Sequence, residues 1–178
     1  MQIIKTKLEG VVIVKITQFK DQRGWFKESF NKKIFKFLKI KNFVQDNISL
    51  SKKIYCFRGL HFQRKPYQQS KLIRVDQGAI LDFVLDLRKN SKTYFQMITI
   101  KLDDKNNKQL FIPKGLAHGF LTLKPNTKIF YKVDQYYSKK HGQGFNILDP
   151  KFKITGFNKA KFNLSTKDKK LPFLHEKN

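Results

Sequence analysis

The feature of this sequence that most constrains its fold is a succession of short apolar runs, each ended by glycine, proline or asparagine. Runs with strand character lie at 8–16, 25–30, 78–88, 94–102, 109–112, 117–123 and 127–137. Only the segment from Asn31 to Lys41 has the apolar spacing of a helix, with Asn31 as its N-cap. Many short strands with almost no helix indicate an all-β antiparallel sandwich or barrel, in which closure protects the strand edges.

The length of the chain predicts one domain. With 178 residues it can bury a substantial core, but it is too short for two ordinary domains. Hydrophobic residues make up 40% and aromatic residues 14%, which excludes disorder for most of the chain. We therefore predict a single domain over 1–178, in which the lysine-rich segment 151–178 is an arm laid over the barrel.

The charge is strongly basic, with 38 lysines and arginines against 13 acidic residues, a net +25. Such a balance suggests nucleic acid, acidic lipid or phosphorylated substrates. The excess is nearly all lysine scattered along the chain, which favours solvated faces over a binding stripe, so we predict neither a nucleic-acid nor a membrane partner. Polyanion binding is kept as an alternative. Arginine suits phosphate better than lysine does, and it occurs only at positions 23, 58, 64, 74 and 88.

Three features predict a cytoplasmic protein. No apolar run approaches the roughly 18 to 20 residues of a membrane helix. The first residues lack the apolar core of a signal peptide. The single cysteine, Cys56, can form no internal disulfide, which agrees with a reducing compartment.

The central stretch of the chain predicts a chemical site. Two strand-like runs flank a polar loop at 64–70, and the first carries Arg58 and His61 while Lys71 opens the second. Alternation along a strand would put Arg58 and His61 on opposite faces unless Gly59 forms a bulge. With a bulge, the two cations and the imidazole converge on one concavity suited to an anionic substrate. A buried, hydrogen-bonded core histidine is the other reading of His61.

Three further residues have both a structural and a chemical interpretation. His118 follows a turn at 113–115, where a histidine often bonds the backbone. Tyr131 lies in a strand, where tyrosine usually packs across strands. Asp168 follows Ser165 by three residues, which is the spacing of a capping box at a helix start.

Taken together, five motifs resemble the dTDP-4-dehydrorhamnose 3,5-epimerase family in order and spacing, over about residues 3 to 172. They are Asp21 to Ser29, Phe43 to Asn47, Arg58 to Gln63, Ile112 to Phe120, and Tyr131 to Ser138. The resemblance implies a cupin-type jelly roll with a few short peripheral helices, a homodimer, no metal and no organic cofactor. It implies epimerisation of a dTDP-4-keto-6-deoxyhexose at C3 and C5, which yields dTDP-4-dehydrorhamnose for deoxysugar and surface polysaccharide biosynthesis.

The resemblance also assigns roles. It makes His61 the general base, Asp168 its partner, Tyr131 the general acid, and Lys71 the lysine near the sugar oxygen. The remaining matches are nucleotide-sugar contacts, namely Arg23, Glu28, Gln45, Asn47, Arg58, His118 and Lys167, with Tyr137 stacking on thymine. These residue types suit the reaction, because a 4-keto group acidifies the C3 and C5 protons and a base and an acid on opposite faces can invert each centre through an enolate.

The chain departs from the family pattern after Ser138. The family usually has a glutamate where this chain has Gly142, and a tryptophan that is missing from 146–150. Inversion at C3 alone, or of another nucleotide-linked 4-keto sugar, is therefore kept as an alternative. A metal-dependent cupin is a more distant one. Such sites usually open with two histidines one residue apart, whereas His61 is followed by Phe62-Gln63.

Overall fold

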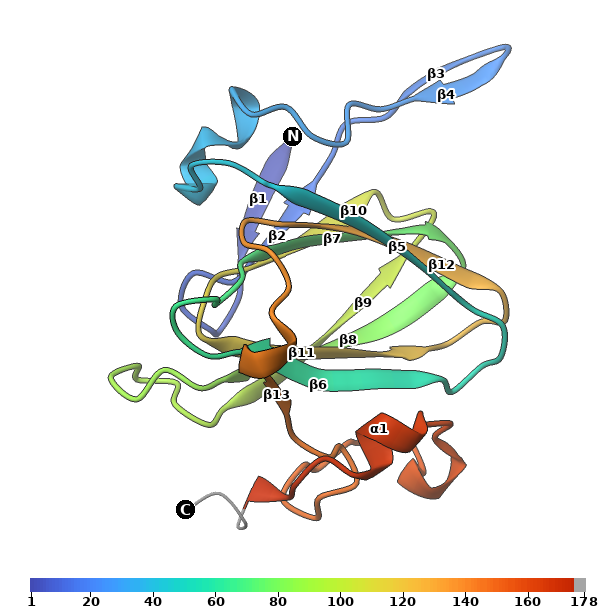
Figure 1. The fold of residues 1–178 in the computed structure, drawn as a ribbon. Helices are drawn as coiled ribbons and strands as arrows, with labels where there is room; N and C mark the ends of the chain where they lie inside the picture. The colour runs from blue at the N-terminus through green and yellow to red at the C-terminus, as the bar shows by residue number, and fades with distance from the viewer. Residues whose placement is uncertain (175–178) are drawn as a thin grey trace.

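Two antiparallel β-sheets lie face to face in the computed structural model, which describes residues 1–174 (Figure 1). The six-stranded sheet has the order β1 (Gln2–Lys5), β2 (Val12–Lys15), β10 (Lys108–Ile112), β7 (Lys71–Gln77), β12 (Thr127–Val133) and β5 (Gln45–Ser51). The five-stranded sheet has the order β13 (Gly142–Gly144), β6 (Phe57–Gln63), β11 (Leu116–Thr122), β8 (Ala79–Asp86) and β9 (Met97–Asp103). This arrangement confirms the predicted jelly-roll sandwich with short peripheral helices.

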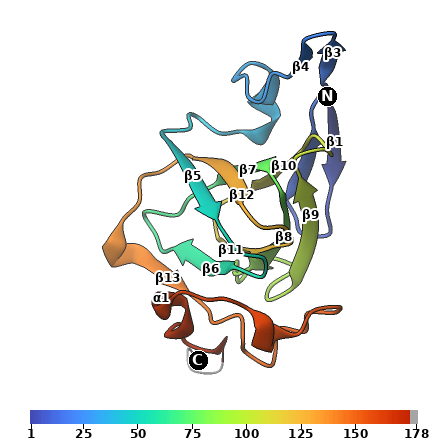
Figure 2. The same ribbon diagram turned by 90° about the vertical axis from the view of Figure 1, so that its right-hand side faces the viewer.

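The remaining elements are small and peripheral. Strands β3 (Phe19–Asp21) and β4 (Gly24–Phe26) form a hairpin that projects away from both sheets (Figures 1 and 2). The helices are the 3₁₀ turns η1 (Ile34–Leu38), η2 (Lys139–His141) and η3 (Lys159–Lys161) and the single α-helical turn α1 (Thr166–Lys169). Within residues 1–174, no helix has the length and apolar character needed to cross a membrane.

The core is divided into an inner cluster and two outer ones. Between the sheets, apolar residues of β7, β10 and β12 meet those of β8, β9 and β11. On the outer side of the five-stranded sheet, Phe57 and Phe83 pack against apolar residues of the C-terminal segment, including Phe152 and Phe162. Strand β8 is consequently buried on both faces, which explains its nearly continuous apolar sequence. The last four residues of the predicted arm, 175–178, lie outside the described range.

The predicted helix over 31–41 is wrong in type and length. The N-cap is Lys33 rather than the predicted Asn31, although Oδ1 of Asn31 accepts hydrogen bonds from the backbone N–H groups of Lys33 and Ile34 just before the turn. The helical turn is 3₁₀ and covers only 34–38. A 3₁₀ turn brings residues three apart onto one face. Phe35 and Leu38 therefore both pack on the outer face of the six-stranded sheet.

Several predicted strands are shorter than expected, and left-handed residues account for two of the differences. The run at 8–16 becomes a strand only from Val12, because Gly10 has φ 79° in the preceding turn. The run at 94–102 begins at Met97, because Phe95 has φ 59°. The runs at 25–30 and 127–137 end at Phe26 and Val133. The polar loop at 64–70 is confirmed.

The predicted bulge at Gly59 is present. His61 pairs with His118 on β11, and Arg58 pairs with Phe120, so three steps along β6 match two steps along β11. Gly59 has φ 133°, and a Cβ at this position would lie 2.5 Å from Cα of Gly119. Only glycine fits this close approach. The bulge removes the alternation that would separate Arg58 from His61, and both side chains line one hollow.

Candidate active site

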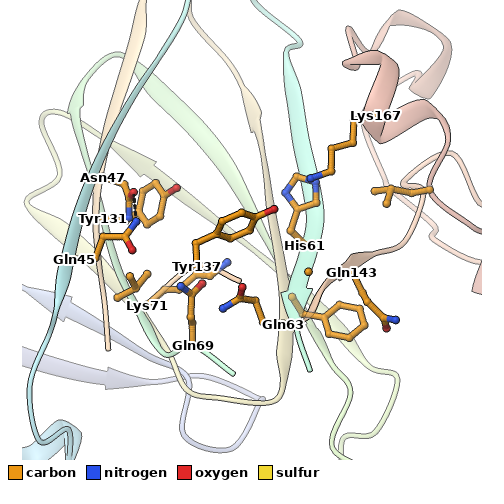
Figure 3. A pocket seen from close by; sticks show the side chains of 14 residues that line it. Gln45, Asn47, His61, Gln63, Gln69, Lys71, Tyr131, Tyr137, Gln143 and Lys167 are labelled. Carbon is orange, nitrogen blue, oxygen red and sulfur yellow. Dashed lines mark hydrogen bonds between the residues drawn. The ribbon is translucent and has the colours of Figure 1, made fainter. Parts of the chain in front are cut away.

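Two adjoining hollows, lined by residues of β5, β7 and β12 in one sheet and of β6 in the other, contain most of the predicted site residues. Their volumes are about 350 and 470 Å³, and four residues line both of them: His61, Lys71, Tyr131 and Lys167. The first hollow, drawn in Figure 3, continues toward Gln45, Asn47 and Tyr137. The second continues toward Arg58, His118 and Asp168. The shared residues make the two hollows parts of one site, which we call the central pocket.

His61 is paired with a buried carboxylate. Its Nε2 lies 2.7 Å from Oδ1 of Asp168, whose residue is 3% exposed. Burial raises the pKa of Asp168, but the hydrogen bond and charge of His61, with the Ser165 hydroxyl, outweigh this and hold the pKa below its usual range. An ionised Asp168 fixes the proton of a neutral imidazole on Nε2, which leaves Nδ1 as a proton acceptor.

Asp168 combines two roles because α1 holds it in place. The Ser165 hydroxyl accepts a hydrogen bond from the backbone N–H of Asp168, as the capping spacing predicts. The carboxylate of Asp168 is then directed at His61 rather than back at the cap. The structural and the chemical interpretation of this residue are thus compatible.

Tyr131 reaches the pocket from the other sheet. It lies on β12, whereas His61 lies on β6, and Figure 3 shows the two rings on opposite sides of the pocket. Burial raises the pKa of Tyr131, although the nearby charge of Arg58 partly opposes this. The phenol is therefore protonated at neutral pH and can donate a proton.

Lys71, His118 and Asp82 form a polar group at the wall of the pocket, in which His118 and Asp82 are buried and Lys71 is half-buried. Burial lowers the pKa of Lys71 to about 8, against the opposing charge of Asp82. Asp82 Oδ2 lies 3.0 Å from His118 Nε2. Burial raises the pKa of Asp82 and lowers that of His118. Asp82 is fully buried in β8, and no sequence motif pointed to it.

The end of the pocket near β5 is rich in amide groups. Gln45 Nε2 donates a hydrogen bond of 2.8 Å to Asn47 Oδ1, and both residues line the hollow. Tyr137 is 57% exposed beside them and presents its ring to solvent. Sequence reasoning did not identify Gln63, Gln69 or Gln143, which also line this hollow. Gln63 could have been found by parity, because it lies two residues after His61 on the same strand.

Arg23 and Glu28 are the two predicted site residues that the chain does not bring to its own pocket. Arg23 lies in the turn of the projecting hairpin, and its guanidinium bonds Asp21 at 2.6 Å. Glu28 follows the hairpin, is exposed, and accepts a hydrogen bond from Asn31. Neither residue lines either hollow of the central pocket.

At position 142, where the family usually has a glutamate, a glycine forms part of the pocket wall. Gly142 lines the pocket on β13, and a Cβ there would lie 3.5 Å from the Tyr137 hydroxyl, in ordinary contact. The wall beside this hydroxyl therefore consists of backbone. In the part of the chain that the structure describes, no three histidine, cysteine or acidic side chains cluster as a metal site would require.

Comparison with known proteins gives a consistent result over nearly the whole chain. The family model for dTDP-4-dehydrorhamnose 3,5-epimerase matches residues 5–176. A relative of that name from Escherichia coli strain K12 is 40% identical over 178 residues, covering 99% of this chain and 96% of the relative.

Solved structures of the same kind superpose closely. The Bacillus anthracis dTDP-4-dehydrorhamnose 3,5-epimerase, crystallised with TDP and PPi, has a TM-score of 0.92 and 44% identity, covering 97% of this chain and 99% of that one. The Legionella pneumophila dTDP-6-deoxy-D-glucose-3,5-epimerase, in complex with dTDP-4-keto-L-rhamnose, has a TM-score of 0.92 and 35% identity, with coverage of 99% and 94%.

Proposed function

Because the chain belongs to the dTDP-4-dehydrorhamnose 3,5-epimerase family, we propose that it inverts C3 and C5 of dTDP-4-dehydro-6-deoxyglucose to give dTDP-4-dehydrorhamnose. The observation that carries this proposal is the placement of the His61–Asp168 pair and Tyr131 on facing sheets around one pocket. The reaction consists of proton transfers, so it invokes neither a metal nor an organic cofactor. The product would serve deoxysugar and surface polysaccharide biosynthesis.

His61 is the proposed base. Its Nδ1 accepts the proton from C3 or C5, which the 4-keto group acidifies, and the electron pair moves to the keto oxygen to form an enolate. Asp168 stabilises the imidazolium that results, through the 2.7 Å contact to Nε2. A positioned base of this kind typically contributes about 10² to 10⁴ in rate.

Tyr131 and Lys71 complete the proposed chemistry. The phenol of Tyr131 gives its proton to the carbon from the face opposite His61, which inverts the centre. Lys71 places a positive charge near the developing enolate oxygen. Both side chains line each hollow of the central pocket together with His61.

The rest of the pocket would hold the nucleotide. Arg58, His118 and Lys167 offer donors for the diphosphate, and Gln45 and Asn47 offer amides for the base. Tyr137 offers an exposed ring on which thymine can stack. Binding energy gathered away from C3 and C5 fixes the sugar ring for proton transfer.

The proposed assembly is a homodimer. The hairpin exposes large aromatic side chains, with Phe19 61%, Trp25 58% and Phe26 67% exposed, and edge strand β5 exposes Ile48 (66%) and Leu50 (47%). A second copy of this chain would cover these surfaces. The same contact would carry Arg23 and Glu28 into the pocket of the partner, which accounts for their distance from their own. The proposed location is the cytoplasm, where the unpaired Cys56 would stay reduced.

The decisive experiment is NMR of the protein with dTDP-4-keto-6-deoxyglucose in deuterated water. We expect deuterium at both C3 and C5, together with signals of the inverted sugar. Deuterium at C3 alone would identify a C3 epimerase, and unchanged substrate would overturn the proposal.

Two variants assign the roles in the same assay. His61→Ala should abolish exchange at both carbons while circular dichroism shows an intact fold. Tyr131→Phe should still exchange deuterium through His61, but without inversion, because the opposite proton donor is missing. Exchange at the wild-type rate in His61→Ala would remove this residue as the base.

A further inference from the structure

The side chain of Gln63 joins three segments of the pocket wall. Gln63 lies on β6, is 6% exposed, and shares the pocket wall with Tyr137 (Figure 3). Its Nε2 donates hydrogen bonds to the carbonyl oxygens of Tyr67 (2.6 Å) and Tyr136 (3.1 Å). Its Oε1 accepts a hydrogen bond of 2.6 Å from the backbone N–H of Ser138. These bonds cross from a strand of the five-stranded sheet to two separate loops.

The bonding pattern leaves no ambiguity about the orientation of the amide. Both carbonyl groups need a donor, and the Ser138 N–H needs an acceptor, so each end of the amide faces the partner that it requires. Both hydrogens of the Gln63 NH₂ group are used. The amide suits these three partners because it offers two donor hydrogens and an acceptor oxygen without a charge.

The contacts to the second loop lie on either side of Tyr137. The carbonyl of residue 136 and the N–H of residue 138 both bond Gln63, so the backbone around Tyr137 is held from both directions. The residue Tyr137 itself is 57% exposed. Its position therefore depends on its backbone rather than on packing of the ring.

We propose that Gln63 is a positioning residue for nucleotide binding, which holds Tyr137 where its ring can stack on the base. The inference rests on the proposed function, and it assigns to Gln63 no contact with the substrate. Without the amide, the loop around Tyr137 would sample other conformations, and part of the base-stacking energy would be lost to ordering it on binding. The reacting groups on β6 and β12 would keep their places.

A double-mutant cycle with dTDP as the ligand tests this proposal by calorimetry. Gln63→Met keeps the length of the side chain but removes all three hydrogen bonds. It should raise the Kd for dTDP on the order of tenfold, which corresponds to partial loss of the energy of one base–aromatic stack. Tyr137→Ala should raise it at least as much. The double variant should bind no more weakly than Tyr137→Ala alone, because both changes act on the same stack. In the epimerase assay, Gln63→Met should raise KM and leave kcat within about threefold.

Thr127→Val is the matched control. It removes a buried hydroxyl that donates 2.8 Å to the Lys124 carbonyl in a turn that contributes no residue to the central pocket, so Kd should stay unchanged. Gln63→Glu is a second variant, which keeps the acceptor for Ser138 but replaces the NH₂ group, with both of its donor hydrogens, by one carboxylate oxygen. It should also weaken dTDP binding.

Hydrogen exchange provides a readout that needs no ligand. The Ser138 amide should exchange faster in Gln63→Met, while the amides of β6 stay protected. Unchanged exchange at Ser138, or a Kd equal to that of the wild type, would overturn the inference. Additive effects in the double variant would also overturn it, because Gln63 would then act independently of Tyr137. Absence of dTDP binding by the wild type would instead refute the proposed function.

Discussion

Lys71 is the residue whose charge the pocket controls most directly. Burial lowers its pKa to about 8, so the ammonium is charged below that pH and neutral above it. In the proposed reaction, stabilisation of the enolate needs this charge. We therefore expect kcat/KM to fall as the pH rises through about 8.

A pH series checks this expectation. Lys71→Met should have a lower kcat/KM at neutral pH and should lack the decline near pH 8. A wild-type profile that stays level to pH 9.5 would show that the charge of Lys71 does not take part.

At the scale of the residue, the sequence predicted some features correctly and gave no sign of others. The bulge at Gly59 and the cap at Ser165 followed from spacing alone, because each is a local property of the backbone. Asp82 was not foreseen as a partner of His118, since the two residues are 36 positions apart and their contact depends on how β8 pairs with β11. Long-range pairs of this kind have no local signal.

At the scale of the element, the close crossing of β6 and β11 supports a sharp prediction. Gly59→Ala places a methyl carbon 2.5 Å from Cα of Gly119, and alanine is strained at the φ of 133° that Gly59 adopts. The steric overlap and the backbone strain both destabilise the folded state. We expect the free energy of unfolding to fall by about 3 to 5 kcal/mol. Urea unfolding followed by circular dichroism measures the loss.

Gly24→Ala provides the comparison. Gly24 has the same φ of 133°, but nothing lies within 4 Å of its added Cβ. Gly24→Ala therefore adds backbone strain without steric overlap, and we expect the free energy of unfolding to fall by about 1 to 3 kcal/mol. Equal losses in the two variants would show that the crossing of the strands does not depend on glycine.

The positions of the longer strands were predicted well and their ends less well, whereas the short strands β1, β3 and β13 were missed. Glycine, proline and asparagine mark turns in the sequence, so the strands that they bound were found. Phe95 adopts φ 59° and delays the start of a strand that was predicted from residue 94, and no propensity of phenylalanine indicates this conformation. The helix predicted over 31–41 was wrong for another reason. Packing of Phe35 and Leu38 against the sheet favours a 3₁₀ turn.

For the whole molecule, the proposed dimer depends on the hairpin. Phe26→Asp puts a charge on an aromatic position that is 67% exposed in the single chain. If a second copy covers it, burial of that charge is unfavourable, and the dimer should dissociate into folded monomers with lower kcat/KM. Sedimentation velocity measures the mass.

Phe95→Asp is the control for the hairpin variant. Phe95 is also exposed, at 44%, but it lies in the turn before β9, outside the proposed interface. The Phe95→Asp variant should have the same sedimentation mass and the same activity as the wild type. A Phe26→Asp protein that retains both the mass and the activity of the wild type would contradict the proposed interface.

A hairpin that leaves its own domain has a consequence for genetics as well as for assembly. If each catalytic centre is shared between two polypeptides, an Arg23→Ala chain and a His61→Ala chain carry defects in different halves of the centre. Co-expression would then produce hybrid particles in which one centre inherits both lesions and the other inherits none. Co-expression of two inactive alleles would then restore activity, and the restored activity would be proportional to the number of hybrid dimers that had formed.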